Sequence, residues 1–245
     1  TNYDLLFEQA HQRAKVPCFD GFTGVSEPFF DPSSVASNDL PPRWTRIWKL
    51  HGSLGWSRNK GGEIIRSGHP DANELVFPDH LKYDQTQKAP WAALFDRLRA
   101  FLMTPDTLLV TTGFSFADAH ISARIGECLA ANPSASVFAF QFKPLDQETH
   151  ACVVAGRRAN MSLYSPDKAM INGVAAPWVP GDPPTRDWAA IRAGYWGVEE
   201  KDGHPKFLLG GFTQLARFFA SSRATQSFPL RTPEPESAGE AKVAK

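Results

Sequence analysis

A histidine followed by glycine and serine stands out in the segment Lys49–Trp56, which reads KLHGSLGW. The preceding residues, Arg46–Leu50, alternate apolar and basic side chains and predict a strand that ends near His51. Gly52 and Gly55 then let the chain turn tightly. A neutral histidine at a strand end can accept a proton near neutral pH. His51 is therefore a candidate general base, or else an ordinary strand-end histidine hydrogen-bonded to a neighbour.

A second candidate segment, Gly113–Ile121, reads GFSFADAHI and follows the apolar run Thr107–Thr112. Such a run is typical of a parallel strand covered on both faces. Gly113 permits close approach of the backbone, Ser115 supplies a hydroxyl, and Asp118 can cap a following helix. A strand, a Gly/Ser turn and a helix N-terminus are together compatible with binding a phosphate or a ribose, although many α/β loops share the pattern.

A third candidate lies at the start of the chain, where Asn2 and Asp4 straddle the beginning of a predicted helix over Tyr3–Ala14. Either side chain could cap this helix. Alternatively, the Asn2 carboxamide could meet the polar groups of a ligand at a strand-to-helix junction, as happens in open α/β folds. Thr1 as an N-terminal nucleophile is disfavoured, because such hydrolases need a strand and a hairpin here rather than a helix.

The elements that must position these residues alternate between strands and helices. The expected elements are a hairpin turning at 58–62 with a return strand at 63–66, a short strand at 75–78, a helix from Pro90 to Leu102, strands at 107–112, 137–142 and 161–164, and a helix at 146–157. This rhythm predicts a Rossmann-like α/β fold, and the handedness of crossovers makes its sheet mostly parallel and flanked by helices. No G-x-G-x-x-G motif occurs in the sequence.

Less regular segments define the remaining parts. Residues 16–42 are rich in Gly, Pro and Phe and predict a long ordered loop that covers a site. Residues 172–184 are predicted to be loop, and 188–191 and 212–219 to be helices of a C-terminal appendage. The expected division is a main domain at 1–165, an appendage at 166–223 and a disordered tail at 224–245, which is rich in Ser, Pro and Glu.

Composition narrows the class of function. The 245 residues are 42% hydrophobic, enough for one substantial core, and the 26 basic residues equal the 26 acidic ones. No direct binding to nucleic acid is therefore expected. Three widely spaced cysteines without a CxxC pair argue against a disulfide framework and a cysteine zinc site. With no membrane-spanning run and no signal peptide, we expect a soluble, cytoplasmic protein.

No metal site is expected either. His69, Asp71, Asp79 and His80 carry ligand chemistry, but their spacing matches no compact metal-binding motif. These four residues are better explained as ordinary residues of a surface loop.

Three stretches, TNYDLLFEQA at 1–10, KLHGSLGW at 49–56 and GFSFADAHI at 113–121, together resemble the bacterial sirtuin-like NAD-hydrolase family of antiphage defence systems. Sirtuins at large carry Gln-Asn-Ile-Asp, Leu-His-Gly-Ser and Gly-Thr-Ser stretches in the same order. The resemblance covers roughly residues 1–142. It implies that residues 1–165 bind NAD as a substrate and cleave it to nicotinamide and ADP-ribose, which depletes cellular NAD in abortive infection.

Roles for single residues follow from this resemblance. Asn2 would position water and ribose, with Asp4 beside it, and His51 would be the base at the ribose. Gly113 and Ser115 would form the ribose-contacting turn, and Asn2, Asp4 and Asp118 would also belong to the residues that bind the cofactor. These residue types suit cleavage through an oxocarbenium-like state, which needs a water-positioning amide and a base near the sugar. The cationic nicotinamide leaves readily, so no strong general acid is required.

Two departures from the sirtuin pattern qualify these expectations. The interval from Leu54 to Thr107 contains no cysteine, whereas deacetylating sirtuins carry a four-cysteine zinc ribbon there. This favours NAD hydrolysis over protein deacylation. The glycine-rich nucleotide turn on the first strand is absent, so we expect Thr1 to lie inside a longer protein.

The alternatives are an NAD-dependent deacylase and a non-catalytic module that binds NAD or ADP-ribose or builds an assembly. The family also implies a homo-oligomer and a partner such as a HerA-class ATPase or a short Argonaute.

Overall fold

The main sheet has five strands in the order β11-β10-β9-β8-β7. Strands β7 (Leu108–Thr112), β8 (Ser136–Phe140) and β9 (Met161–Tyr164) are parallel. The hairpin of β10 (Lys168–Ile171) and β11 (Val174–Pro177) extends the sheet in antiparallel fashion. The computed structural model describes residues 1–37, 39–68, 75, 90–179, 181–182, 189, 191–198 and 203–224. The predicted Rossmann-like α/β class is confirmed.

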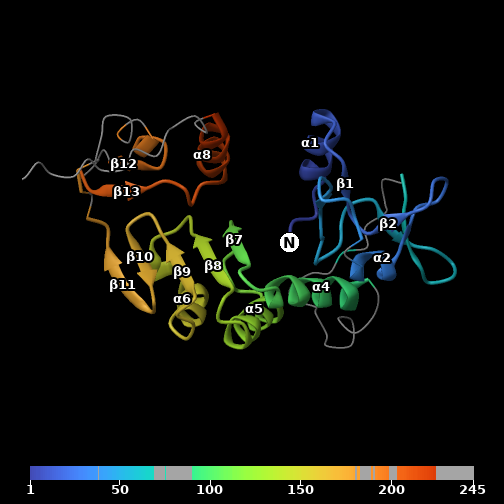
Figure 1. Ribbon diagram of the computed structural model, residues 1–245, viewed down its shortest axis with the longest axis horizontal. Helices are drawn as coiled ribbons and strands as arrows, with labels where there is room; N and C mark the ends of the chain where they lie inside the picture. Colours follow the sequence, from blue (N-terminus) through green and yellow to red (C-terminus); the bar gives the residue numbers. More distant parts are fainter. Residues whose placement is uncertain are drawn as a thin grey trace, which may run out of the picture.

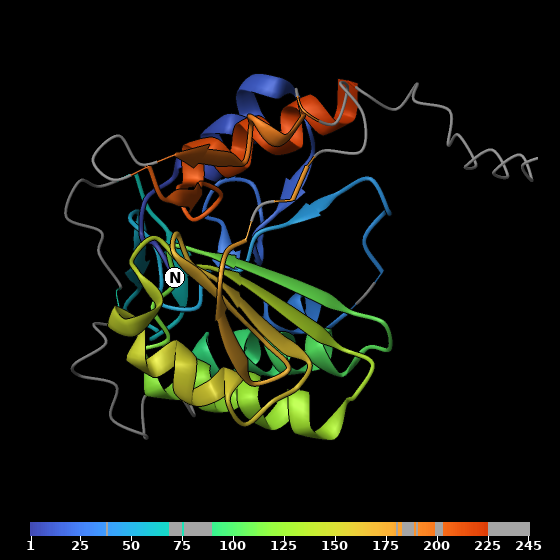
Figure 2. The same ribbon diagram turned by 90° about the vertical axis from the view of Figure 1, so that its left-hand side faces the viewer.

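Helices α4 (Trp91–Met103), α5 (Ala119–Ala131) and α6 (Thr149–Ala155) lie along one face of this sheet (Figures 1 and 2). The short 3₁₀ turn η2 (Leu145–Gln147) precedes α6, so the helix expected at 146–157 is shorter than predicted. Apolar residues at helical spacing in α4 and α5 pack against β8 and β9, whose side chains alternate between the faces of the sheet. The fully buried members of this core include Leu102, Val137, Ala139, Met161 and Leu163.

The N-terminal part consists of short elements beside α4 (Figure 1). Four strands pair in the order β2-β3-β6-β5, and β1 pairs with β4 in parallel. An aromatic cluster of Phe22, Phe30, Trp56 and Trp91 joins this small sheet to α4. The elements are α1 (Leu6–Ala14), β1 (Cys18–Phe19), β2 (Phe22–Thr23), β3 (Phe29–Phe30), α2 (Pro32–Ala36), β4 (Thr45–Arg46), β5 (Trp56–Arg58) and β6 (Ile64–Arg66).

Several local predictions are wrong in this part. The segment 16–42 is not one long loop, because its phenylalanines pair and pack as β1, β2 and β3, and α2 follows them. The strand expected at Arg46–Leu50 shortens to β4, since its partner β1 is only two residues long. The predicted hairpin is confirmed as β5 and β6. The strand expected at 75–78 lies outside the described residues except for Leu75, which bridges to Gly52.

The segment expected to form the C-terminal appendage, 166–223, begins with the β10–β11 hairpin of the main sheet. It continues with β12 (Trp196–Val198), β13 (Pro205–Phe207) and α8 (Phe212–Ala224). The helix expected at 212–219 is confirmed, whereas the strand pair was not predicted. The segment 172–184 is not all loop, because Asn172 and Gly173 both adopt positive φ and turn the β10–β11 hairpin. Of the expected helix at 188–191, only 189 and 191 lie in the described part, and 225–245 lie outside it. No described helix is long and apolar enough to cross a membrane.

Gly210 lies at a close contact between the C-terminal segment and Gln141, the residue that follows β8. A Cβ at this position would overlap the carbonyl oxygen of Gln141, whose buried side chain donates to the carbonyl of Phe114 at 3.3 Å. Because backbone atoms cannot yield easily, we expect Gly210→Ala to lower the free energy of unfolding by about 1–3 kcal/mol in chemical denaturation. Gly68→Ala is the control, since a Cβ there meets no atom within 4 Å. Equal losses in both variants would contradict the close contact.

Candidate active site

His51 and Asp118 come together as a buried pair. The Nε2 atom of His51 lies 3.0 Å from Oδ2 of Asp118, and the two side chains are only 4% and 7% exposed. His51 stands in the turn between β4 and β5, whereas Asp118 follows β7. The fold therefore brings two of the predicted site residues to one point, from segments far apart in the sequence.

Asp118 is held by the helix that it caps. Its Oδ1 accepts a hydrogen bond of 3.0 Å from the Ile121 N–H, as predicted for the start of α5. Burial raises the pKa of the Asp118 carboxyl, but the close contact with His51 and the N–H groups of Ile121 and His120 outweigh it, so the pKa lies below its usual value. The carboxylate thus stays ionised near neutral pH, where it can orient the imidazole and stabilise its protonated form.

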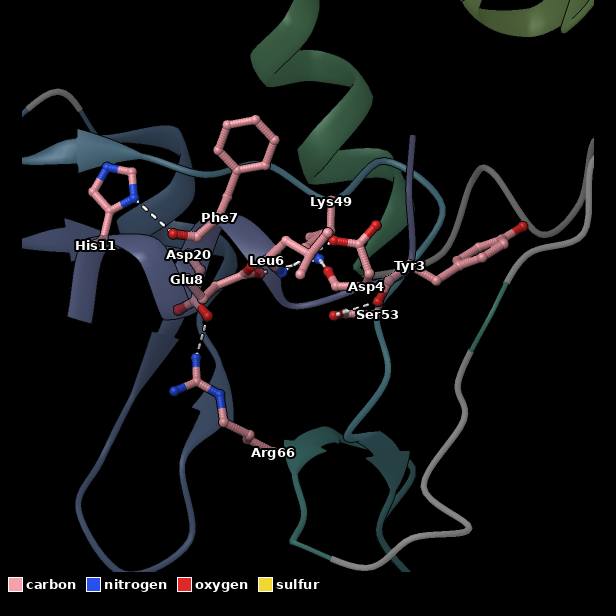
Figure 3. Close-up of polar contacts among 10 residues, drawn as sticks. All are labelled: Tyr3, Asp4, Leu6, Phe7, Glu8, His11, Asp20, Lys49, Ser53 and Arg66. Atoms are coloured by element: carbon pink, nitrogen blue, oxygen red, sulfur yellow. Dashed lines mark hydrogen bonds and ion pairs between the residues drawn. The ribbon is translucent and has the colours of Figure 1, made fainter. Parts of the chain in front are cut away.

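Tyr3 and Asp4 lie beside Lys49 and Ser53 of the turn that carries His51, residues 49–55, which we call the histidine turn (Figure 3). The carbonyl of Tyr3 accepts hydrogen bonds from the Leu54 N–H at 3.0 Å and from the buried Ser53 hydroxyl at 3.3 Å. The ring of Tyr3 lies 6.5 Å from that of His51, between ring centroids. Burial and the Asp118 carboxylate both raise the pKa of Tyr3. This segment therefore borders the buried pair.

The two candidates on that segment differ in their surroundings. Asp4 is half-buried, and its Oδ1 accepts a hydrogen bond of 3.0 Å from the Leu6 N–H, which stabilises the start of α1. Asn2 is exposed, two positions before Asp4. The helix-stabilising role thus belongs to Asp4, and Asn2 is an exposed residue next to Tyr3, whose carbonyl contacts Ser53 and Leu54.

Gly113 and Ser115 lie in the loop that connects β7 to α5. Gly113 has a φ of 65°, and a Cβ there would meet no atom within 4 Å, so the space beside it is open. Ser115 is exposed. Phe116 is buried and anchors the loop. Its carbonyl oxygen accepts a hydrogen bond of 2.7 Å from the Ser122 hydroxyl. The loop follows the carboxyl end of a parallel strand, where open α/β sheets bind ligands.

Other features of the described residues also suit a polar ligand. The hydroxyls of Thr111 and Thr112, at the end of β7, are buried without a hydrogen-bond partner in the structure. Buried polar atoms normally find partners, so this edge of the sheet can accommodate further hydrogen bonds. Within the described part of the chain, no three His, Cys, Asp or Glu side chains gather as they would around a metal ion. His69, Asp71, Asp79 and His80 lie outside the described residues.

Sequence reasoning missed Lys49 and its partner Glu8. Lys49 is buried and contacts both Glu8 and the Asp4 carbonyl. The available signal was the position of Lys49 at the end of the predicted strand Arg46–Leu50, directly before Leu50 and His51.

The comparisons with known proteins bear on the same residues. The family model described as SIR2-like domain matches residues 1–158, which include all the candidate site residues. The chain belongs to the SIR2-like domain family. SIR2-like domains bind NAD and are generally NAD-dependent enzymes. A comparison with curated proteins finds no match.

NAD, the ligand that SIR2-like domains bind, is consistent with the polar groups of the described residues. The open space beside Gly113, the hydroxyl of Ser115 and the buried His51–Asp118 pair provide the polar groups that a ribose requires.

Proposed function

We propose that this SIR2-like protein is an NAD glycohydrolase, which cleaves NAD with water to nicotinamide and ADP-ribose. The observation that carries the proposal is the buried contact of 3.0 Å between His51 and Asp118. It couples a candidate base to a carboxylate beside the segment that carries Asn2 and the loop that carries Gly113.

The reaction breaks the bond between the nicotinamide nitrogen and the ribose and forms a bond from that ribose carbon to water oxygen. The electron pair of the broken bond goes to nicotinamide, which leaves as a neutral molecule. The water loses a proton, and His51 serves as the base at the ribose that takes up the proton released at the site. Asp118 stabilises the resulting imidazolium, and Asn2 positions the water.

Gly113 and Ser115 contribute to binding rather than to proton transfer. The backbone at Gly113 can approach the ribose closely, and the Ser115 hydroxyl can hydrogen-bond to it. Asp4 supports the segment through its contact with the Leu6 N–H. Precise placement of the ribose matters because rate depends steeply on the geometry of the reacting atoms.

The absence of cysteine between Leu54 and Thr107 favours hydrolysis over deacylation. Protein-deacetylating sirtuins build part of the acyl-lysine groove with a four-cysteine zinc ribbon in this interval. A chain without those cysteines cannot form that ribbon, and water is then the simpler acceptor.

We extend the proposal to the biological role that the sequence motifs imply. Cleavage of NAD in the cytoplasm would deplete it during phage infection and stop the host cell. The protein would act as a homo-oligomer and with a partner that senses infection, such as a HerA-class ATPase or a short Argonaute.

Nicotinamide release with and without an acyl-lysine peptide tests the proposed reaction. We expect the protein to release nicotinamide from NAD at the same rate in both conditions. Release that strictly requires the peptide would instead show a deacylase. Binding of NAD or ADP-ribose in calorimetry without any release would show a binding module.

A further inference from the structure

Lys49 is a buried cation that links the histidine turn to the start of α1 (Figure 3). Its Nζ lies 3.1 Å from Oε1 of Glu8 and also donates a hydrogen bond to the carbonyl oxygen of Asp4. The side chains of Lys49 and Glu8 are 8% and 20% exposed. The ammonium group of Lys49 thus connects the N-terminal segment, at Asp4 and Glu8, to the turn that carries His51.

Helix α1 has little apolar attachment to the rest of the molecule. None of its residues is buried, and Leu6 and Phe7 are 66% and 56% exposed. Phe7 contacts Phe212 of α8 edge-on, with ring centroids 6.2 Å apart. The segment before the helix is held by the hydrogen bonds of the Tyr3 carbonyl and by Lys49. Polar contacts therefore carry much of the positioning of this segment.

We propose that Lys49 is a positioning residue of the NAD-cleaving site, which keeps Asn2 in register with His51. The inference rests on the proposed function for its catalytic consequence. Lysine suits this task, because its ammonium offers three donors on a long stem and can serve a carboxylate and a carbonyl together. Burying such a pair adds little net stability, so its value lies in fixing one geometry.

The expected consequence of losing Lys49 is a displaced Asn2. Removal of the ammonium leaves the Glu8 carboxylate and the Asp4 carbonyl without this donor. The segment then shifts toward water, which moves Asn2 away from its place beside the histidine turn. A misplacement of about 1 Å can cost on the order of 10²-fold in rate.

Steady-state kinetics of NAD cleavage test this role with Lys49→Met. We expect kcat to fall by about 10- to 100-fold, with KM changed much less, because the ribose contacts of Gly113 and Ser115 remain. In an Asn2→Ala background, Lys49→Met should cost little more, since both changes remove the same contribution. Lys168→Met is the matched control, because Lys168 is 45% exposed on β10 and should leave kcat unchanged.

Glu8→Gln provides a milder second variant. It removes the charge of the partner but keeps a hydrogen-bond acceptor for Lys49, so a smaller loss of kcat is expected. If the double variant loses kcat by the product of the two single losses, the positioning role is overturned. A general loss of stability would act independently of Asn2 and give that result.

Amide hydrogen exchange of residues 2–9 supplies a readout that does not depend on turnover. We expect faster exchange there in Lys49→Met and in Glu8→Gln than in the native protein, with β7 to β9 unaffected. Unchanged exchange at residues 2–9 would overturn the inference even if the native protein cleaves NAD. Native protein that releases no nicotinamide would refute the proposed function, whereas the exchange experiment would still decide whether Lys49 positions the segment.

Discussion

Replacing His51 with alanine is expected to lower kcat for NAD cleavage by about 10²- to 10⁴-fold, the range that a general base contributes. The imidazole lies at the buried contact with Asp118, and alanine leaves no group there to take up a proton. Nicotinamide release, measured by chromatography at saturating NAD, gives kcat directly. The exposed His150 on α6 provides the control, since His150→Ala should keep the native rate.

A second variant separates chemistry from folding. His51→Ala leaves a cavity and an unpaired buried carboxylate, which also lowers the free energy of unfolding. His51→Gln fills more of the space and can still donate a hydrogen bond to Asp118, yet it cannot act as a base. Both variants should therefore lose kcat to a similar extent, with His51→Gln the more stable in thermal unfolding. Native kcat in His51→Gln would contradict the role of His51 as the base.

Replacing Asp118 with asparagine is expected to lower kcat by roughly 10- to 10³-fold, because the carboxylate orients and supports the base. Asparagine is as good an N-cap as aspartate, so α5 should keep its start and the fold its structure. Steady-state kinetics and circular dichroism of Asp118→Asn check the two statements together. A native rate would show that His51 acts without the carboxylate.

The lowered pKa of Asp118 leads us to expect that the free energy of unfolding depends on pH. Its pKa is lowered in the folded protein, so its charged form stabilises the fold fully above the usual carboxyl pKa of about 3.9. This stabilising contribution is lost as the pH falls below the usual carboxyl pKa and then through the lower pKa of Asp118 in the folded protein. The stability advantage of the native protein over Asp118→Asn should therefore shrink between neutral and strongly acidic pH in denaturant titrations. A difference that does not change with pH would contradict the interaction.

Asp31 supplies a matched control for Asp118. It caps α2, and the hydroxyl of Ser34, together with backbone N–H groups, lowers the pKa of its carboxyl. Asp31→Asn should thus also reduce the acid sensitivity of stability. Because Asp31 has no contact with His51 in the structure, the same change should leave kcat at the native value, unlike Asp118→Asn.

The main sheet and its helices were predictable because their patterns are long and periodic. The helix from Pro90 and the strand before Gly113 both appear close to their expected bounds. The two-residue strands between 16 and 42 were missed, since elements this short carry no period and depend on the aromatic cluster for their stability. The Asn172–Gly173 turn was a hairpin signal that the loop interpretation of 172–184 overlooked.

The candidate site shows the same limit of local patterns. The sequence predicts Asp118 as a helix cap, because the cap depends on residues three positions away. Its contact with His51 depends instead on how β7 lies relative to the histidine turn, which no local pattern encodes. Lys49 was missed for the same reason, since its partners Glu8 and Asp4 lie more than forty positions earlier in the sequence.

The proton NMR time course of NAD incubated with the protein alone tests the central claim most directly. The account predicts that free nicotinamide and ADP-ribose appear in equal amounts as NAD disappears, and that neither appears with His51→Gln. NAD that stays intact with the native protein, or equal product formation by His51→Gln, would contradict the assignment of this site as an NAD glycohydrolase.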